Sequence, residues 1–266
     1  MKNKQVDKKV VVITGASSGI GLCTAQLFAK NGYKVYGLSR RLYKTDSFTS
    51  IACDVCDTEK VRKTFEEIYL TEGRIDVLIN NAGMGISGAI EYLTEKDFDT
   101  VFSVNVKAVA MLSSLAIPYL RRTKGKIINT SSVAAVVPLP YQACYSATKS
   151  AIESFSFALS QEVKSQGIKV VCVRPGDTKT GFTASRIKTE KENSVYGTKI
   201  TESVKKMEKD EMNGKSPLSV AKVMLKLAKS KNPPPVCSVG FAYKCACVTA
   251  KLLPQRLVNY IVGKLY

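Results

Sequence analysis

The 266-residue sequence contains no histidine. This absence excludes a Ser-His-Asp triad, histidine acid–base catalysis and any metal site that needs imidazole ligands. If the protein moves protons during catalysis, another type of side chain must carry them, such as tyrosine or lysine.

Long apolar runs are absent as well. No run approaches the roughly 18 apolar residues that a membrane-spanning helix requires. Residues 1–4 are basic, but the apolar run that follows at 10–13 is short, so we expect no signal peptide and a cytoplasmic location. The eight cysteines are then expected to be reduced. Cys53 and Cys56 have CxxC spacing, but a single such pair is a poor indication of zinc, and we predict no metal site.

Acidic residues are few: 22 Asp and Glu stand against 40 Lys and Arg, which gives a net charge of +18. Such an excess suits anionic partners, namely a phosphorylated cofactor, a membrane surface or nucleic acid, although it also fits a lysine-rich solvated surface. Because no Lys/Arg block is interleaved with aromatic residues, we expect no nucleic-acid partner.

The C-terminal stretch, 231–266, has no acidic residue at all. It carries five basic residues together with apolar residues that form one or two helical faces. A basic amphipathic tail of this kind, at 241–266, can dock on its own core, lie on an anionic membrane surface or pack against a partner subunit. The apolar members are Leu252, Leu253, Leu257, Val258, Ile261, Val262 and Leu265.

Strand and helix patterns alternate along residues 1–240, with no internal repeat and no linker. This alternation predicts a single α/β domain, a Rossmann-type doubly wound parallel sheet of about seven strands with helices on both faces. Residues 177–215 are polar and weakly periodic, and we interpret them as a substrate lid or a surface loop. The predicted strands are 10–13, 33–39, 51–53, 75–79, 126–130, 168–173 and 236–239, and the predicted helices are 22–31, 58–71, 94–120, 141–166 and 217–229.

Glycines lie between the first predicted strand and the first predicted helix, in the stretch Thr14-Gly15-Ala16-Ser17-Ser18-Gly19-Ile20-Gly21. Glycines at this point allow a tight turn and a close approach of the backbone to a pyrophosphate. The helix N-terminus offers N–H donors and the positive end of its dipole. The stretch therefore predicts a dinucleotide site.

A second group of polar residues has the spacing of an acid–base site. Tyr145 and Lys149 are four apart on a predicted helix, so they share a face, and a nearby ammonium lowers the pKa of a phenol. Ser132 follows the fifth predicted strand, and its hydroxyl could bind the same substrate oxygen as Tyr145. Asn105, in mid-helix, could hold a water or a backbone group that links to Lys149.

Taken together, these residues resemble the short-chain dehydrogenase/reductase family, single-domain type, over residues 8 to about 240. The glycine stretch matches TGxxxGxG, Asn80-Asn81-Ala82-Gly83 matches NNAG, and Tyr145 with Lys149 matches YxxxK. Asp54-Val55 after the third strand and Pro175-Gly176 with Thr180 also fit. The resemblance implies that Asn105, Ser132, Tyr145 and Lys149 are catalytic, with Tyr145 as the acid or base. It implies a nicotinamide cofactor bound by Gly15, Ser17, Ser18, Gly19, Ile20, Gly21, Ser39, Arg40, Arg41, Asp54, Val55, Asn81, Ala82, Gly83, Tyr145, Lys149, Pro175, Gly176, Thr178 and Thr180.

The end of the second predicted strand indicates which cofactor. A carboxylate there would bind the ribose 2′-OH of NAD, whereas this sequence has Ser39 followed by Arg40 and Arg41. Arginine suits a 2′-phosphate through charge-assisted, bidentate hydrogen bonds. We therefore predict NADP(H), the alternative being two solvated arginines.

The extra C-terminal residues favour an apolar substrate. The tail resembles the hydroxysteroid-dehydrogenase-like branch, which implies a steroid, retinoid or lipid-like ketone, aldehyde or alcohol. A 3-oxoacyl thioester reductase and a non-catalytic NADP(H) sensor are the alternatives. The resemblance also implies a homodimer or homotetramer. Residues that could line the pocket are Pro138, Leu139, Tyr141, Phe182 and Tyr196.

Overall fold

The computed structural model describes residues 8–189 and 195–266. Its centre is a seven-stranded sheet in the order β3-β2-β1-β4-β6-β7-β9, with every neighbouring pair parallel. Strands β1 to β3 are added outwards in one direction. The chain then returns to place β4 on the other side of β1 and continues to the opposite edge, which is the arrangement of a doubly wound fold. The predicted fold class is confirmed. The strands are β1 (Val10–Thr14), β2 (Lys34–Ser39), β3 (Thr49–Ala52), β4 (Val77–Asn80), β6 (Lys126–Thr130), β7 (Lys169–Arg174) and β9 (Val236–Ser238).

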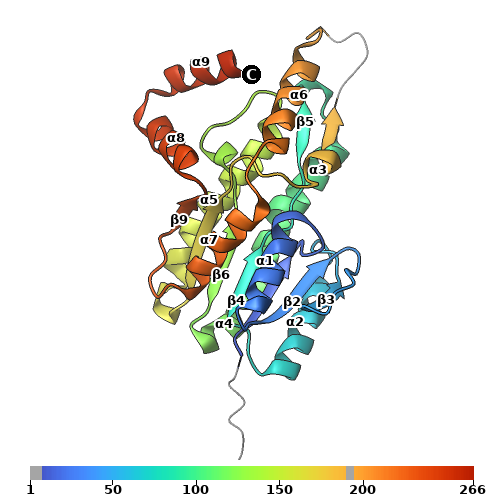
Figure 1. The fold of residues 1–266 in the computed structure, drawn as a ribbon, viewed down its shortest axis with the longest axis vertical. Helices are drawn as coiled ribbons and strands as arrows, with labels where there is room; N and C mark the ends of the chain where they lie inside the picture. Colours follow the sequence, from blue (N-terminus) through green and yellow to red (C-terminus); the bar gives the residue numbers. More distant parts are fainter. Residues whose placement is uncertain (1–7, 190–194) are drawn as a thin grey trace, which may run out of the picture.

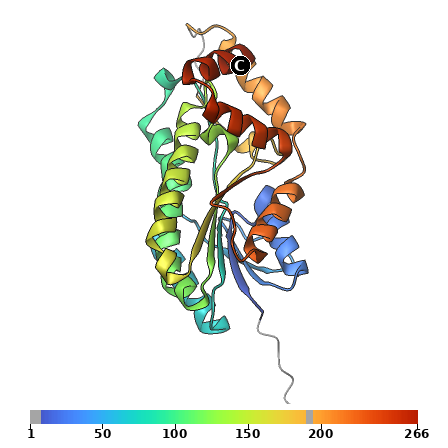
Figure 2. The ribbon, with the colours of Figure 1, turned by 90° about the vertical axis from the view of Figure 1, so that its left-hand side faces the viewer.

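Helices cover both faces of this sheet (Figures 1 and 2). On one face, α1 (Gly19–Lys30) and α7 (Pro217–Lys229) bury Phe28 and Met224 against β1 and β7. On the other, α2 (Thr58–Glu72), α4 (Ala108–Thr123) and α5 (Ala143–Glu162) bury residues such as Phe65 and Leu112. The strands therefore have apolar cover on both sides, which explains why β1 reads as an unbroken apolar run.

The helix starts follow their caps. Asp57 accepts a hydrogen bond from the backbone N–H of Lys60 at 2.9 Å and begins α2. Thr94 caps α3 (Glu95–Phe102) in the same way, from Asp97 N at 3.1 Å. Each side-chain oxygen satisfies a backbone donor that would otherwise lack a helical partner.

The predicted helix at 94–120 is interrupted. A π turn at Ser103–Lys107 separates α3 from α4, and Asn105 lies within it. Single π turns occur often at functional sites because they displace one side chain from the regular helical spacing. By length and mean hydropathy, Glu95–Thr123 could cross a membrane. Its apolar residues Val101, Leu112 and Leu120 are instead buried inside the fold.

The described parts of the segment 177–215 have more regular structure than the sequence pattern predicted, and residues 190–194 of this predicted lid lie outside the described residues. The segment contains β8 (Ile187–Thr189), which pairs in parallel with β5 (Ile86–Gly88), and the helix α6 (Lys199–Met212). Neither small strand nor α6 was predicted. Buried Ile200 and Val204 hold α6 against the body, although its other residues are mostly polar.

The predicted amphipathic tail forms two helices, α8 (Phe241–Leu252) and α9 (Gln255–Leu265). They lie beside α6, at the end of the molecule opposite the N-terminal side of β1 (Figure 1). Parallel strands all point towards this end, so the tail covers the edge of the sheet where a doubly wound fold binds its ligands.

Candidate active site

The turn between β1 and α1 is built on glycines that lack room for a side chain. Gly15 has a φ of +68°, and a Cβ there would lie 3.0 Å from Ala82 Cα. A Cβ at Gly21 would lie only 2.1 Å from the Gly15 carbonyl oxygen. The backbone is therefore packed tightly around a cradle at the N-terminus of α1. Such a cradle fits a pyrophosphate, which needs N–H donors at short range.

Thr14 fixes the cradle to the next strand. Its Oγ1 accepts hydrogen bonds from the backbone N–H of Asn81 at 3.0 Å and of Ala82 at 2.9 Å. In return the Asn81 side chain donates to the Thr14 carbonyl at 3.0 Å. Sequence reasoning placed Asn81 on the cofactor, whereas in the structure its side-chain NH₂ also ties β4 to β1. The structural role of Thr14 was missed.

A cavity of about 1490 Å³ runs along this edge of the sheet. It is larger than the roughly 300–1,000 Å³ of an ordinary small-molecule site, so it has room for a dinucleotide and a substrate. Of the predicted cofactor residues, only Gly21 lies outside its lining, because Gly21 packs beneath Gly15. Those that line it are Gly15, Ser17, Ser18, Gly19, Ile20, Ser39, Arg40, Arg41, Asp54, Val55, Asn81, Ala82, Gly83, Tyr145, Lys149, Pro175, Gly176, Thr178 and Thr180.

Two exposed arginines stand at one end of the cavity. Ser39, the last residue of β2, is buried and its hydroxyl donates to the Arg41 carbonyl at 2.6 Å. This bond shapes the turn that places Arg40 and Arg41 on the cavity wall. Asp54 also lines this end, and its side chain accepts from the backbone N–H of Cys56 at 2.9 Å.

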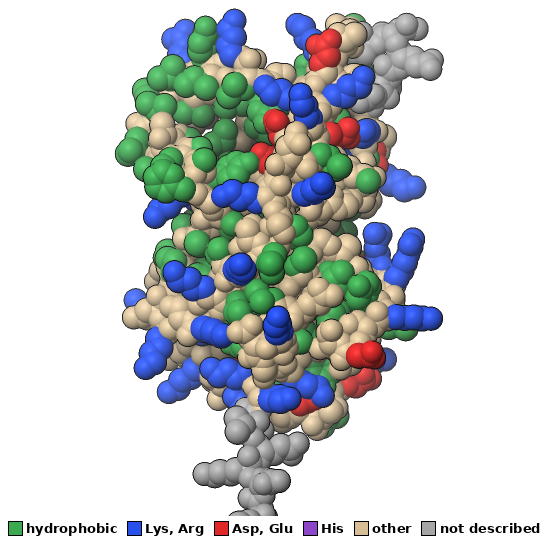
Figure 3. All heavy atoms as spheres, viewed as in Figure 1, with side chains coloured by type: hydrophobic (Ala, Val, Ile, Leu, Met, Phe, Trp, Pro, Cys, Tyr) green, Lys and Arg blue, Asp and Glu red, His purple; other side chains and the backbone are tan. Residues whose placement is uncertain are grey.

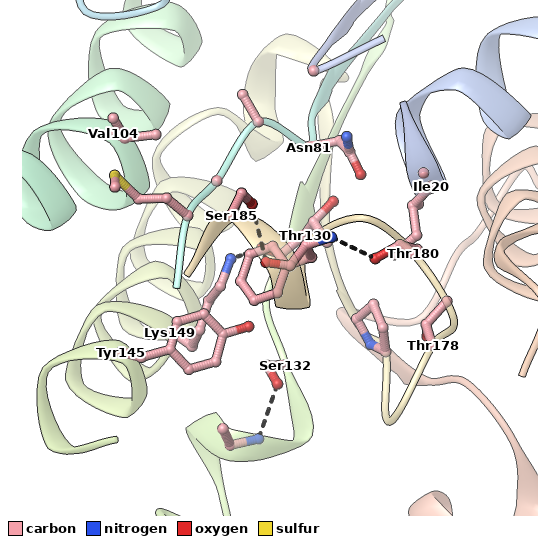
Figure 4. A pocket seen from close by; sticks show the side chains of 18 of the residues that line it. Ile20, Asn81, Val104, Thr130, Ser132, Tyr145, Lys149, Thr178, Thr180 and Ser185 are labelled. Carbon is pink, nitrogen blue, oxygen red and sulfur yellow. Dashed lines mark hydrogen bonds between the residues drawn. The ribbon is translucent and has the colours of Figure 1, made fainter. Parts of the chain in front are cut away.

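The predicted catalytic side chains meet further along. Tyr145 and Lys149 project from α5, and the Lys149 Nζ lies 5.6 Å from the centre of the Tyr145 ring. Ser132 comes from the loop after β6, where it caps a short 3₁₀ turn by accepting from Ala134 N at 3.1 Å. Figure 4 shows the hydroxyls of Tyr145 and Ser132 close together in the pocket. One carbonyl oxygen could therefore contact both.

The pKa of Tyr145 is raised to about 12, chiefly by burial, while the Ser132 hydroxyl lowers it and Glu211 raises it. Burial also lowers the pKa of Lys149 to about 8. The predicted lowering of the tyrosine pKa is therefore wrong for the protein alone. Burial outweighs the two groups that lower this pKa, the Ser132 hydroxyl and Arg186, and Lys149 is not one of them. The consequence is a tyrosine that holds its proton at neutral pH and can donate it.

Lys149 is itself oriented by the backbone. Its Nζ donates to the Thr130 carbonyl at 2.9 Å, at the end of β6. An ammonium has three donors, so Lys149, which lines the cavity, can also donate to a ribose hydroxyl. The residues present therefore fit the nicotinamide half of a dinucleotide.

Asn105 acts from behind the cavity and is not part of its lining. Its Oδ1 accepts from Met84 N at 2.9 Å, and its Nδ2 donates to Met84 O at 2.9 Å and to Thr148 Oγ1 at 3.1 Å. The sequence predicted that Asn105 holds a water or a backbone group that links to Lys149. In the structure Asn105 holds the backbone of Met84, whereas the Lys149 Nζ donates to the Thr130 carbonyl, so the link to Lys149 stays a prediction. Asn105 thus joins the loop after β4 to the helix that carries Lys149.

The substrate end was predicted only in part. Leu139 and Phe182 line the cavity as expected, but Pro138, Tyr141 and Tyr196 do not. Tyr141 and Tyr196 stack edge to face at 6.1 Å in a separate cluster with α6. Their aromatic character reflects packing of the segment 177–215 onto the body.

The tail supplies lining residues that sequence reasoning missed, namely Tyr243, Ala246, Val262, Leu265 and Tyr266. The Tyr243 ring packs on Gly176, where a Cβ would come within 2.3 Å of it. Its hydroxyl donates to Asp177 Oδ2 at 2.5 Å and accepts from Asp177 N at 3.1 Å. The basic, apolar pattern of the tail predicted helices but could not show that their inner sides close the pocket.

No group of three His, Cys, Asp or Glu within residues 8–189 and 195–266 could hold a metal ion. All eight cysteines are free thiols, and Cys53 and Cys56 line the cofactor end of the cavity. Metal chemistry therefore has no ligand set in this part of the chain.

Comparison with known proteins agrees with this geometry. Residues 9–191 match the family model of the short chain dehydrogenases. The chain belongs to the short-chain dehydrogenase/reductase family. As a member of that family it is an oxidoreductase of the nicotinamide-dependent type.

Three similar proteins show how far the likeness to other family members extends. A 3-ketodihydrosphingosine reductase from Bacteroides thetaiotaomicron is 39% identical over 263 residues, 97% of this chain and 98% of the relative. A short-chain dehydrogenase from Streptomyces avermitilis superposes with a TM-score of 0.82 at 28% identity and covers 97% of each chain. ElxO with NADP bound has a TM-score of 0.74 at 26% identity and covers 90% of this chain and 99% of its own. The first two likenesses include the tail as well as the Rossmann core.

Proposed function

We propose that this short-chain dehydrogenase/reductase uses NADPH to reduce the ketone of a long-chain lipid, of the 3-ketodihydrosphingosine class, to an alcohol. The observation that carries the proposal is the apolar substrate end of the cavity, closed by the tail. The relative whose name specifies such a ketone is similar over 97% of this chain, so it has a counterpart to that tail.

The lining of the substrate end supports an aliphatic ligand. Leu139, Phe182, Met207, Val262 and Leu265 come from four separate parts of the chain and line the same end of the cavity. Burial of alkyl carbons against such side chains contributes about 0.8 kcal/mol per CH₂, so a long chain would be favoured over a short one.

Two carboxylates in the same wall suit an amine beside the ketone. Glu211 and Asp177 line the substrate end, and Glu211 is close enough to raise the pKa of Tyr145. Glu211 also pairs with Arg186 and accepts from Thr183, which holds its position. A ligand carrying an ammonium near its carbonyl would be attracted here, whereas an uncharged acyl thioester would gain nothing.

The catalytic residues fit reduction. Tyr145, whose raised pKa keeps it protonated, would donate its proton to the ketone oxygen while the Ser132 hydroxyl binds the same oxygen. NADPH supplies the hydride that reaches the carbonyl carbon. Lys149 would stabilise the tyrosinate left behind and hold the ribose. Arg40 and Arg41 support NADPH over NADH, because no carboxylate ends β2 and both arginines line the cavity.

The proposal is tested by NADPH oxidation with 3-ketodihydrosphingosine, a 3-oxoacyl thioester, a ketosteroid, retinal and a short aldehyde, with NADH in parallel. We expect turnover on the amino ketone with NADPH, and a loss of at least 1,000-fold in kcat for Tyr145→Phe with NADPH binding retained. Turnover confined to the thioester would assign the protein to acyl-thioester reduction. Silence throughout, with NADPH bound, would favour a sensor.

A variant pair tests the recognition of the amine. Asp177→Asn and Glu211→Gln should lower kcat/KM for the amino ketone more than for an amine-free ketone of equal length. An equal loss on both ketones would show that the carboxylates only support the fold.

A further inference from the structure

The outer side of the tail is an exposed apolar surface. Phe241 is 82% exposed, Leu252 80% and Tyr260 64%, fractions that leave most of each side chain in water. We call this surface the tail patch, and in Figure 3 hydrophobic side chains gather over α8 and α9 at the upper left. A soluble protein rarely leaves so many large apolar groups together without a partner. The tail patch consists of Phe241, Val248, Leu252, Leu257, Tyr260, Ile261 and Leu265.

Positive charge accompanies the tail patch. Lys244, Lys251, Arg256 and Lys264 are exposed on the same two helices, and residues 241–266 contain no Asp or Glu. Exposed apolar and basic side chains on a short helical segment are the composition of a helix that lies in the interface of an anionic bilayer. A second copy of this chain would bring the same cations face to face, on molecules that each carry +18, so electrostatics disfavour that occupant.

The tail patch is continuous with the substrate cavity. Tyr243 and the buried Val262 line the cavity, while Ala246 and Leu265 line it and are also exposed, Leu265 to 53%. Tyr266 next to it lines the cavity and its hydroxyl lies 3.3 Å from Asp210 Oδ2 on α6. The rim of the substrate end is therefore made by the helices that carry the tail patch.

We propose that α8 and α9 dock this protein on the surface of an anionic membrane, with the tail patch at the headgroup boundary and the pocket rim against the lipid. The docking itself rests on the tail. Its use, entry of a membrane-dissolved ketone past Leu265 without passage through water, rests on the proposed function.

Vesicle flotation tests the docking, with vesicles of phosphatidylcholine alone and of phosphatidylcholine with 30% phosphatidylglycerol. We expect flotation with the anionic vesicles, weakening as salt rises because the Debye length shortens. The double variant Phe241→Ser/Leu252→Ser should bind at least tenfold more weakly. Its control is Leu70→Ser, since Leu70 is 84% exposed and belongs to α2, a helix at the other end of the molecule from α8 and α9 (Figure 1).

A charge-matched pair isolates the basic residues. Lys251→Gln/Arg256→Gln should lose the preference for anionic vesicles, whereas Lys63→Gln/Lys164→Gln, with the same net charge but outside the tail, should keep it. Equal losses in the two double variants would overturn the proposal, because binding would then follow overall charge. Absence of flotation of the wild type would overturn the proposal as well. So would a wild-type dimer that binds no vesicles and becomes a monomer in the Phe241→Ser/Leu252→Ser variant, because the tail patch would then be a subunit contact.

The docking and the proposed function can fail separately. Flotation is measured without cofactor or substrate, so flotation together with a silent ketone panel would contradict the function alone. Turnover of the lipid ketone without flotation would contradict the docking alone. Because Phe241 and Leu252 do not line the cavity, their double variant should keep its activity on a short, soluble ketone. Loss of that activity would mean that the tail patch serves the fold, which would overturn the docking.

Discussion

Replacement of Asn105 by alanine should loosen the joint between the two halves of the active site. The buried carboxamide makes three hydrogen bonds, two to the backbone of Met84 and one to Thr148. At about 1 kcal/mol for each, with a further penalty for the buried Met84 groups left unpaired, the expected loss is about 3–5 kcal/mol in the free energy of unfolding. Natural domains have about 5–15 kcal/mol in total, so the variant should still fold.

A graded comparison separates this joint from a general packing effect. Thr148→Val leaves both bonds between Asn105 and Met84 in place. It removes the bond from Asn105 to the Thr148 hydroxyl and the bond from that hydroxyl to the Tyr145 carbonyl at 2.7 Å. It should cost about 1–2 kcal/mol. Urea unfolding of both variants gives the two values, and NADPH turnover gives the catalytic effect. We expect Asn105→Ala to be the less stable of the two variants. Equal stability would show that the bonds from Asn105 to Met84 do not hold the loop after β4 in place.

Three further predictions concern the cofactor side. Because burial lowers the pKa of Lys149 to about 8, the unfolded chain holds a proton on this lysine between pH 8 and 10.5 that the folded protein has lost, and the contribution of Lys149 to stability should rise with pH there by up to roughly 3 kcal/mol. Burial raises the pKa of Cys172 to about 11, which lowers stability in the same pH range in wild type and variant alike. In urea unfolding at pH 7 and 9.5, the change in stability should therefore be more favourable in the wild type than in Lys149→Met. Arg40→Ala/Arg41→Ala should weaken NADPH binding about 10–100-fold and leave NADH binding nearly unchanged, and an equal effect on both cofactors in fluorescence titration would contradict 2′-phosphate recognition. Gly21→Ala should abolish binding of both cofactors, because its Cβ would collide with the Gly15 carbonyl, and retained affinity would show that the cradle can expand.

The Rossmann core and the cofactor end could be predicted because their signals are local. The apolar run of β1 and the glycines after it fix a strand, a turn and a helix within about twenty residues. Asp57 and Thr94 mark helix starts for the same reason, since a cap acts within its own turn. Tyr145 and Lys149 meet because four residues make about one helical turn.

The substrate end could not be predicted because it depends on contacts between distant segments. Tyr243 and Asp177 are 66 positions apart, and no short pattern records that they touch. The strands β5 and β8 are three residues each and become visible only as a pair. The prediction of a lowered pKa for Tyr145 failed for a related reason. The spacing of Tyr145 from Lys149 is visible in the local sequence, whereas the burial that raises its pKa is set by the whole fold.

The two ends of the cavity are encoded in different stretches of the chain. Nearly all of the cradle, the arginines and the catalytic side chains come from residues before 177, while α6 and the tail, after 177, build most of the substrate wall. The residues that carry out the reaction and the residues that select the substrate thus lie in separate parts of the sequence. Exchange of the segment 177–266 between relatives should therefore transfer substrate selectivity, while the same proton donor and hydride site continue to work. Residue 177 is accordingly a suitable crossover point for recombination and design.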